Sequence, residues 1–135
     1  MNPKEKKVRE RGRTAFNRVI DEAGGVYNYQ EVANLLDLNE EAVLNLSAEG
    51  GLLSFAMNDV TVFPVWQFNK ESVIKEVIDI VHLLDDDCGI SKALFFLTYD
   101  EDLGKTPIEA IKQNNPEDMK IIHILVKQYY VQVAR

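Results

Sequence analysis

The 135-residue sequence predicts a mainly α-helical protein with a winged-helix-like N-terminal half that contains a β-hairpin, followed by a helical C-terminal half. Apolar residues recur at helical spacing in segments that are separated by Gly-Gly pairs and by Asn, Asp, Thr and Pro caps. Residues 53–64 instead alternate around Asn58-Asp59, which is typical of a hairpin. We therefore expect one compact unit with two subparts, residues 1–68 and 69–135.

Three helices are expected before the hairpin. The first covers residues 13–23 and stops at Gly24-Gly25, and the second begins after Asn28, whose capping-box partner is Glu31. A tight turn at residues 37–39 leads into a third helix, which Asn39 caps and which runs to about residue 48 before Gly50-Gly51. Ala33, Asp37 and Val43 have the spacing of a helix-turn-helix, with Asp37 in place of the usual glycine because Asp tolerates the left-handed conformation.

The hairpin should pair Met57 with Val60, Phe55 with Val62 and Leu53 with Pro64. These residues form an apolar face, and the opposite face carries Ser54, Ala56, Thr61 and Phe63. Pro64 lacks the N–H that a further ladder bond needs, so it should end the second strand.

The C-terminal half should contain four helices. We expect them at residues 70–84 after an Asn69 cap, at 89–98, from Thr106-Pro107 to about 113, and at 117–131 after Asn115-Pro116. The second of these is so apolar that we expect it to be buried on most sides.

The net charge of −7 is unevenly distributed. Residues 1–20 carry seven bases and two acids, whereas residues 21–135 carry eight bases and twenty acids. A basic arm on an acidic body can bind a polyanion such as duplex DNA, or the acidic face of its own or a partner chain.

The sequence does not predict an enzyme. His82 and His123 fall on polar helix faces, and the Gly-Gly pairs follow helices instead of preceding them, so neither suggests a catalytic or nucleotide site. Acidic loops lack the glycine and glutamate positions of a calcium loop. We expect no catalytic residue, no cofactor, no metal and no membrane span, in a cytoplasmic protein.

Two interaction sites are predicted instead. If the third helix reads DNA, only Asn45 and Ser47 suit base contacts, and phosphate contacts would come from Lys4, Lys6, Lys7, Arg9, Arg11 and Arg13. Alternatively, Glu40, Glu41 and Glu49 on that helix bind a basic protein. Tyr130 and Val131 at the end of the last helix suggest a homodimer.

The block Phe63-Pro64-Val65-Trp66-Gln67-Phe68 resembles a signature of bacterial proteins related to the Xre/MbcA/ParS-like antitoxin family. The resemblance continues through residues 93–97, Leu103-Gly104 and Thr106-Pro107, which look like that family's toxin-binding segment, and covers roughly residues 50–130. It implies a C-terminal region that dimerises and binds a RES-type toxin, which degrades NAD, and an N-terminal helix-turn-helix that represses the operon.

Two functions are therefore expected as alternatives. One is an antitoxin-like DNA-binding regulator that also neutralises a toxin, and the other is a protein-interaction module with a degenerate helix-turn-helix.

Within the signature block itself we expect a structural corner. Pro64 should stop the ribbon, Trp66 and Phe68 should wedge it against the helical half, and Gln67 should satisfy a buried backbone group.

Overall fold

The computed structural model describes the backbone of residues 2–84 and 88–133, and the side chains in these ranges except those of residues 5–10, 12 and 130–133. This part of the chain is mainly helical, with short antiparallel strands in its middle. The elements are α1 (Pro3–Glu22), β1 (Val26–Tyr27), α2 (Tyr29–Leu36), α3 (Glu40–Ala48), β2 (Phe55–Met57), β3 (Val60–Pro64), the 3-10 helix η1 (Val65–Gln67), β4 (Phe68–Asn69), β5 (Ser72–Val73), α4 (Lys75–Leu83), α5 (Gly89–Leu97), α6 (Pro107–Gln113) and α7 (Pro116–Val133).

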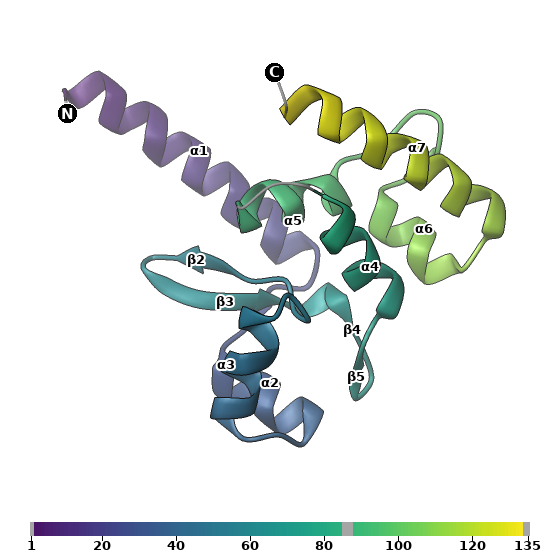
Figure 1. Cartoon of the computed structure of the whole chain (residues 1–135). Helices are drawn as coiled ribbons and strands as arrows, with labels where there is room; N and C mark the ends of the chain where they lie inside the picture. Colours follow the sequence, from purple (N-terminus) through teal and green to yellow (C-terminus); the bar gives the residue numbers. More distant parts are fainter. Residues whose placement is uncertain (1, 85–87, 134–135) are drawn as a thin grey trace.

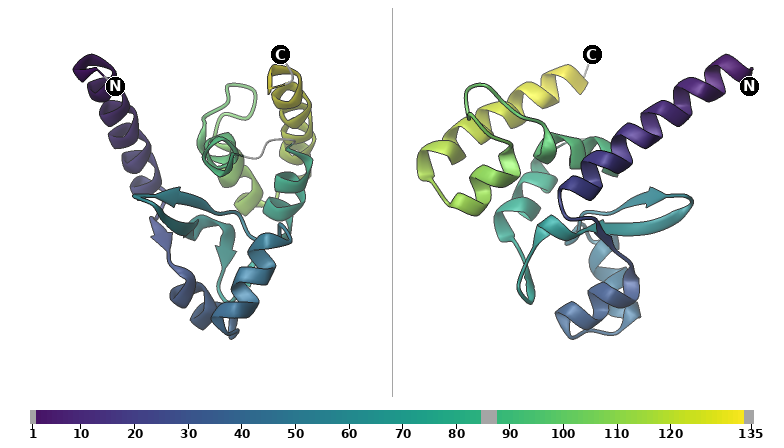
Figure 2. Two further views of the ribbon diagram at one scale, coloured as in Figure 1. Left: turned by 60° about the vertical axis from the view of Figure 1, so that its left-hand side comes forward. Right: turned by 180° about the vertical axis from the view of Figure 1, so that it is seen from behind.

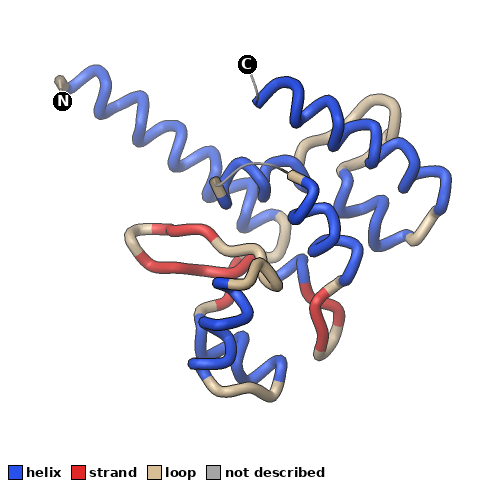
Figure 3. Tube along the Cα trace, viewed as in Figure 1, coloured by secondary structure: helices blue, strands red, loops and turns tan. Residues whose placement is uncertain are grey.

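The hairpin β2–β3 lies between two helical groups (Figure 1). In that view α2 and α3 lie below it, whereas α4 to α7 lie above it and to the right. The strands are confined to the hairpin, to β1 and to the small β4–β5 ribbon (Figure 3). Helix α1 runs away from the body, and its N-terminal half points away from α2 and α3 in all three views (Figures 1 and 2).

The predicted caps at Asn28, Asn39 and Thr106 are confirmed. Asn28 accepts a hydrogen bond from the backbone N–H of Glu31, whose carboxylate accepts one in return from the N–H of Asn28, and Thr106 and Glu109 repeat this capping box at α6. Asn39 caps α3 by accepting from the N–H of Ala42 at 2.8 Å. Hydrogen bonds from local side chains therefore mark where these helices begin.

Helix α1 is longer than expected. The sequence predicted a helix over residues 13–23, but α1 begins at Pro3, so the basic segment is part of one continuous helix. Proline suits the first helical position, and the Lys, Glu and Arg residues that follow are good helix formers. The C-terminal half of α1 packs on the body through Ile20, which is buried, and Phe16, whose ring lies 5.4 Å from that of Phe55.

The hairpin has the predicted turn and register over three pairs. Asn58 and Asp59 have positive φ angles of 52° and 65°, which the two central residues of such a hairpin turn require. Phe55 pairs with Val62. The predicted pairing of Leu53 with Pro64 is not formed, because the N–H and the C=O of Leu53 both pair with the side chain of Gln67. Pro64 pairs with Val26 of β1 on the opposite edge of β3. The three strands therefore lie in the order β1-β3-β2.

The hairpin is buried on both faces at its base, which the sequence did not predict. Phe55 and Val62 join the larger hydrophobic cluster with residues of α1, α4, α5, α6 and α7. Phe63, expected on the more polar face, is fully buried in a smaller cluster with Val32, Ala33, Val43, Leu52 and Phe68. One ribbon thus separates two hydrophobic clusters.

The signature block forms a corner, as predicted, but its aromatic residues diverge. Pro64 ends β3, and Trp66 packs in the larger cluster with its ring 5.2 Å from that of Phe96. Phe68 instead packs in the smaller cluster beside Tyr27, so the expectation that it wedges against the helical half is wrong. Among the side chains described, the indole N–H of Trp66 is buried without a hydrogen-bond partner.

Gln67 is fully buried and pairs with the backbone of Leu53 at both ends of its amide. Its Oε1 accepts from the N–H of Leu53 at 2.8 Å, and its Nε2 donates to the carbonyl of Leu53 at 2.8 Å. This confirms the predicted role of Gln67 in satisfying a buried backbone group.

The predicted helix over residues 70–84 is wrong at its start. Residues 68–73 form the ribbon β4–β5, in which Phe68 pairs with Val73, and α4 begins at Lys75. The ribbon is favoured because Phe68 belongs to the smaller cluster and Val73 packs against it. Lys70 at the turn adopts a left-handed φ of 56°. Asn69 therefore caps no helix.

The three last helices agree with the predicted ranges to within about two residues. Helix α5 is less buried than expected, because Leu94 is 38% exposed and only Ala93 and Phe96 are buried. Helix α7 buries Ile122 and Val126 on its inner face.

Gln67 provides a test of the corner. We expect Gln67→Leu to lower the free energy of unfolding by about 3 kcal/mol, because it leaves the N–H and C=O of Leu53 buried without partners. Urea denaturation followed by circular dichroism measures this loss. The control Gln30→Leu, on the exposed side of α2, should change it by less than about 0.5 kcal/mol. A loss below about 1 kcal/mol at Gln67 would contradict the role assigned to the amide.

Gly89, the first residue of α5, provides a second test. A Cβ at this position would overlap the carbonyl oxygen of Ser54, which is backbone and cannot move aside cheaply. We expect Gly89→Ala to cost about 2 kcal/mol or more of unfolding free energy. Gly104→Ala is the matched control, because that site has open space and only its φ of +70° costs about 1 kcal/mol. Equal losses at the two sites, measured by urea denaturation, would show that α5 does not press on Ser54.

Candidate interaction surface

Helices α2 and α3 form a pair whose connection follows the predicted spacing. Ala33 and Val43 are buried against each other's helices in the smaller cluster, and Asp37 takes a left-handed φ of 56° at the end of α2. The N–H of Leu38 donates to the carbonyl of Ala33 at 2.9 Å and closes the turn. These buried contacts hold the two helices together on their inner sides, and the outer side of α3 faces solvent.

The outer side of α3 carries carboxylates. Glu40, Glu41 and Glu49 are exposed, as is Asn45. Ser47 is half-buried, and its Oγ lies 3.4 Å from the Oγ of Ser54 at the entry to the hairpin. Of the two residues predicted for base contacts, only Asn45 is therefore exposed on α3.

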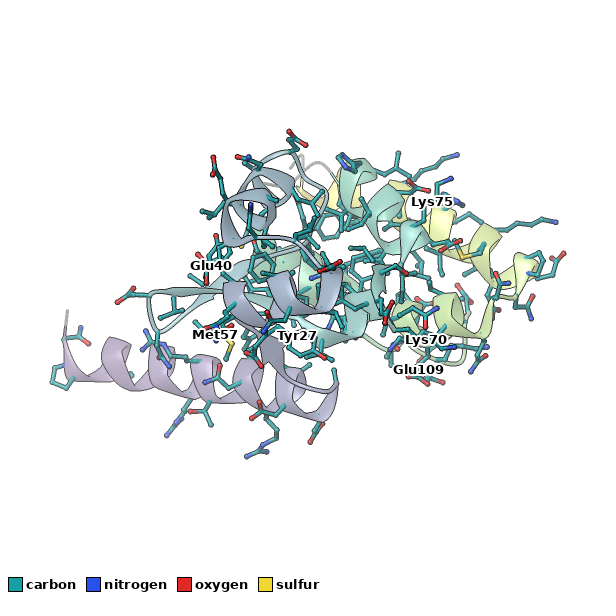
Figure 4. All side chains as sticks on the ribbon, turned by 90° about the horizontal axis from the view of Figure 1, so that it is seen from below. Tyr27, Glu40, Met57, Lys70, Lys75 and Glu109 are labelled. Carbon is teal, nitrogen blue, oxygen red and sulfur yellow. The ribbon has the colours of Figure 1, made fainter. Side chains whose placement is uncertain are left out.

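The chain has no Lys, Arg or His between Arg18 and Lys70. This base-free segment, residues 19–69, includes α2, α3 and the whole hairpin, and its eight carboxylates are all exposed: Asp21, Glu22, Glu31, Asp37, Glu40, Glu41, Glu49 and Asp59. The next bases along the chain, Lys70 and Lys75, lie at the other side of the molecule from Glu40 (Figure 4). No positive charge within the segment offsets these carboxylates.

Two exposed leucines lie in the base-free segment, on α3 and in the turn before it. Leu44 on α3 is 49% exposed and Leu38 in the preceding turn is 41% exposed. Sequence reasoning missed them, although Leu44 follows Glu40 and Glu41 by four and three residues and must share their side of the helix. The surface combines negative charge with apolar side chains, which suits a protein partner better than a phosphate backbone.

The predicted basic residues lie on α1. Lys4, Arg11 and Arg13 are exposed, as is Arg18 in the half of α1 that packs on the body. The side chains of Lys6, Lys7 and Arg9 lie outside the part of the chain that the structure describes, and so do those of Tyr130 and Val131 at the end of α7. The structure does not bring the basic half of α1 next to α3, because the two lie in opposite directions from the hairpin (Figures 1 and 2).

The second part of the signature forms a structural loop. Leu103 is buried, Gly104 has a φ of 70°, and the Asp100 carboxylate accepts from the N–H groups of Asp102 and Leu103. Pro107 is fully buried at the start of α6, directly after the Thr106 cap.

Lys105, between Gly104 and Thr106, ties this loop to the helices that follow. Its Nζ donates to the carboxylate of Asp118 at 2.9 Å and to the side-chain oxygen of Gln113 at 2.6 Å. Sequence spacing did not reveal these contacts, because they join α7 and the end of α6 to a loop.

A groove of about 570 Å³ lies between α5 and α7. It is lined by Leu94, Phe95, Tyr99, Leu125 and Tyr129 among others, and Tyr99 is 63% exposed. The groove falls within the segment for which the family resemblance implies toxin binding.

Other classes of site receive no support from the residues described. In residues 2–84 and 88–133 no three His, Cys, Asp or Glu side chains gather in a way that could hold a metal ion. No helix in these ranges combines the length and the apolar character needed to cross a bilayer. His82 and His123 are exposed on their helices, as predicted.

Comparison of the chain with protein-family models, with curated proteins and with solved structures finds no match.

Proposed function

We propose that this protein is a protein-interaction module that binds a basic partner protein through the acidic surface of α2, α3 and the intervening turn. The absence of any base from the segment 19–69, together with the exposure of its eight carboxylates, carries this proposal. Duplex DNA has one negative charge per 1.7 Å or so of its axis, so a helix that enters a groove must tolerate phosphates on both sides. A surface with carboxylates alone is repelled there.

The arrangement of the N-terminal half supports a winged-helix origin for this module. The chain order α1-β1-α2-α3-β2-β3, with β1 paired to β3, is the order that such a unit requires. In a winged helix of this kind α3 would be the recognition helix and residues 58–59 the tip of the wing. Both carry carboxylates here, at Glu40, Glu41 and Asp59. We therefore propose a degenerate helix-turn-helix.

The exposed leucines favour a protein as the occupant of the acidic surface. Charge complementarity speeds association and selects partners, but buried apolar side chains supply most of the affinity of a protein interface. Leu44 and Leu38 can supply such contacts, and Glu40 and Glu41 lie on the same side of α3 as Leu44. The toxin partner implied by the family resemblance stays a prediction, as does its binding to the C-terminal half.

A charge-reversal capture experiment tests the protein-interaction function. Tagged protein is used to capture partners from nuclease-treated lysate of the native cell, and the captured proteins are quantified by mass spectrometry. We expect one basic protein in stoichiometric amount with the wild type, and at least tenfold less, or about 1.4 kcal/mol, with Glu40→Lys, Glu41→Lys and Glu49→Lys combined.

The control variant combines Glu101→Lys, Asp102→Lys and Glu117→Lys, which changes the net charge equally at exposed positions of the C-terminal half. It should capture the partner as the wild type does. If the α3 variant retains the partner in full, or if both variants lose it equally, the acidic surface is not the binding site.

A second candidate function is DNA binding through α1. The observation that favours it is the concentration of seven bases in residues 4–18 of a helix whose N-terminal half diverges from the body (Figure 2). Such a helix can follow a phosphate backbone without any contact from α3, and binding would then be independent of sequence. This would be the DNA-linked part of an antitoxin-like regulator.

Salt dependence tests the DNA candidate. We expect affinity for a labelled duplex, measured by fluorescence anisotropy, to fall steeply with salt, and the combined variant Arg11→Gln and Arg13→Gln to reduce the log–log slope by about 2. Lys120→Gln with Lys127→Gln, on the exposed side of α7, should leave the slope unchanged. If the affinity does not change with salt, or if the two pairs of substitutions reduce the slope equally, α1 is not the DNA contact.

A further inference from the structure

The two most strongly charged parts of the chain have opposite sign and do not meet within one molecule. Residues 1–18 carry seven bases and two acids, whereas residues 19–69 carry eight acids and no base. In the views of Figures 1 and 2 the N-terminal half of α1 and the α2–α3 pair extend in opposite directions from the hairpin. Within the part of the chain that the structure describes, the two oppositely charged surfaces therefore do not contact each other.

The basic half of α1 cannot fold back onto α2 and α3 of its own chain while α1 stays intact. Helix α1 is continuous from Pro3 to Glu22, and its C-terminal half is anchored by Ile20, which is fully buried, and by Phe16 against Phe55. The remaining turns, about 15 Å long, follow the direction that this anchor sets. Contact within the chain would require the helix to break.

The basic half of α1 also lacks a hydrophobic stripe of its own. Between Lys4 and Thr14 the sequence has one aliphatic residue, Val8, and Gly12 lowers the helical propensity of the segment. A helix that is polar on all sides is stabilised chiefly by charged neighbours or by a partner. An acidic surface from another molecule would supply that stabilisation.

We propose that two copies of this chain form a reciprocal dimer in which the basic half of α1 of each copy lies on the acidic α2–α3 surface of the other. Placing two copies side by side and antiparallel brings the basic end of one beside the acidic end of its partner, and the two-fold axis repeats the contact. Two equivalent contacts then close the assembly. Charge complementarity of residues 1–18 with the carboxylates at Glu31, Asp37, Glu40 and Glu41 selects a second copy as the occupant.

The dimer is a property of this chain beyond the proposed function, because it forms without a foreign partner. It also differs from the dimer expected at Tyr130 and Val131, since the contact involves α1 and α3 and depends on charge. A foreign basic partner of the acidic surface would compete with α1 of the second copy. Binding of that partner would therefore release monomers.

A charge-swap experiment tests the dimer by sedimentation equilibrium on the full chain. At about 0.05 M salt we expect the wild type to have twice the 15.4 kDa of the chain, and at about 0.5 M salt to dissociate into monomers. Arg11→Glu with Arg13→Glu, and separately Glu40→Lys with Glu41→Lys, should each raise the dimer dissociation constant at least tenfold or so.

Mixing the two variants gives the decisive result. In an equimolar mixture the Glu-substituted α1 of one variant faces the Lys-substituted α3 of the other, and the unaltered surfaces still match. A heterodimer should therefore form at concentrations at which neither variant dimerises alone. A single chain with all four substitutions should again form a homodimer. Circular dichroism of each variant checks that α1 and α3 remain helical.

Control variants keep the test specific. Lys120→Glu with Lys127→Glu, and Glu101→Lys with Asp102→Lys, change exposed charges elsewhere and should leave the dimer intact. The proposed dimer is contradicted if the wild type is monomeric at low salt or if its molecular mass does not change with salt. It is also contradicted if the wild type assembles beyond two copies, or if the mixture of the two variants stays monomeric. Loss of the dimer alone leaves the proposed function standing, because capture of a foreign partner is measured separately.

Discussion

The hydrogen bonds between the Gln67 side chain and the backbone of Leu53 hold the centre of this structure together. Leu53 leads into β2 and Gln67 follows β3, so the amide joins both ends of the hairpin where they enter the protein interior. Without these bonds the backbone of Leu53 would be buried with unpaired polar groups, which costs more than ordinary loops tolerate. The ribbon can therefore be buried on both faces, with Trp66 on one side and Phe68 on the other.

This arrangement explains why the charged surfaces lie apart. The larger cluster anchors the end of α1 on one face of the ribbon, and the smaller cluster anchors α2 and α3 on the other face. Because the two clusters lie on opposite faces of the ribbon, the two sets of helices project to opposite sides (Figure 1). A separation of charge along the sequence thus becomes a separation of charge in space, and it makes the molecule suited to contacts between molecules.

Most local features could be predicted from the sequence, because they depend on residues a few positions apart. The caps at Asn28, Asn39 and Thr106, the left-handed Asp37 and the Asn58-Asp59 turn are of this kind. The β4–β5 ribbon could not be predicted, since Asn69 followed by Lys70 and Glu71 also reads as a helix start. Tertiary packing of Phe68 and Val73 decides between the two.

The candidate site was predictable in composition but not in arrangement. The carboxylates at Glu40, Glu41 and Glu49 are visible in the sequence, and so is the run from Arg18 to Lys70 without a base. The direction of α1 relative to α3 depends on how Phe16 meets Phe55 across the ribbon, which no local pattern contains. The contacts of Lys105 with Asp118 and Gln113 were missed for the same reason, because they join separate elements.

The position of Trp66 has an optical consequence. It is the single tryptophan of the chain, it is 2% exposed, and its ring lies against Phe96 in the larger cluster. Its fluorescence therefore reports on the environment of that cluster alone, while the smaller cluster around Phe63 contains no tryptophan. Because its indole N–H is buried without an acceptor among the side chains described, the emission should be blue-shifted in the native protein and should move to the red as soon as water reaches this one position.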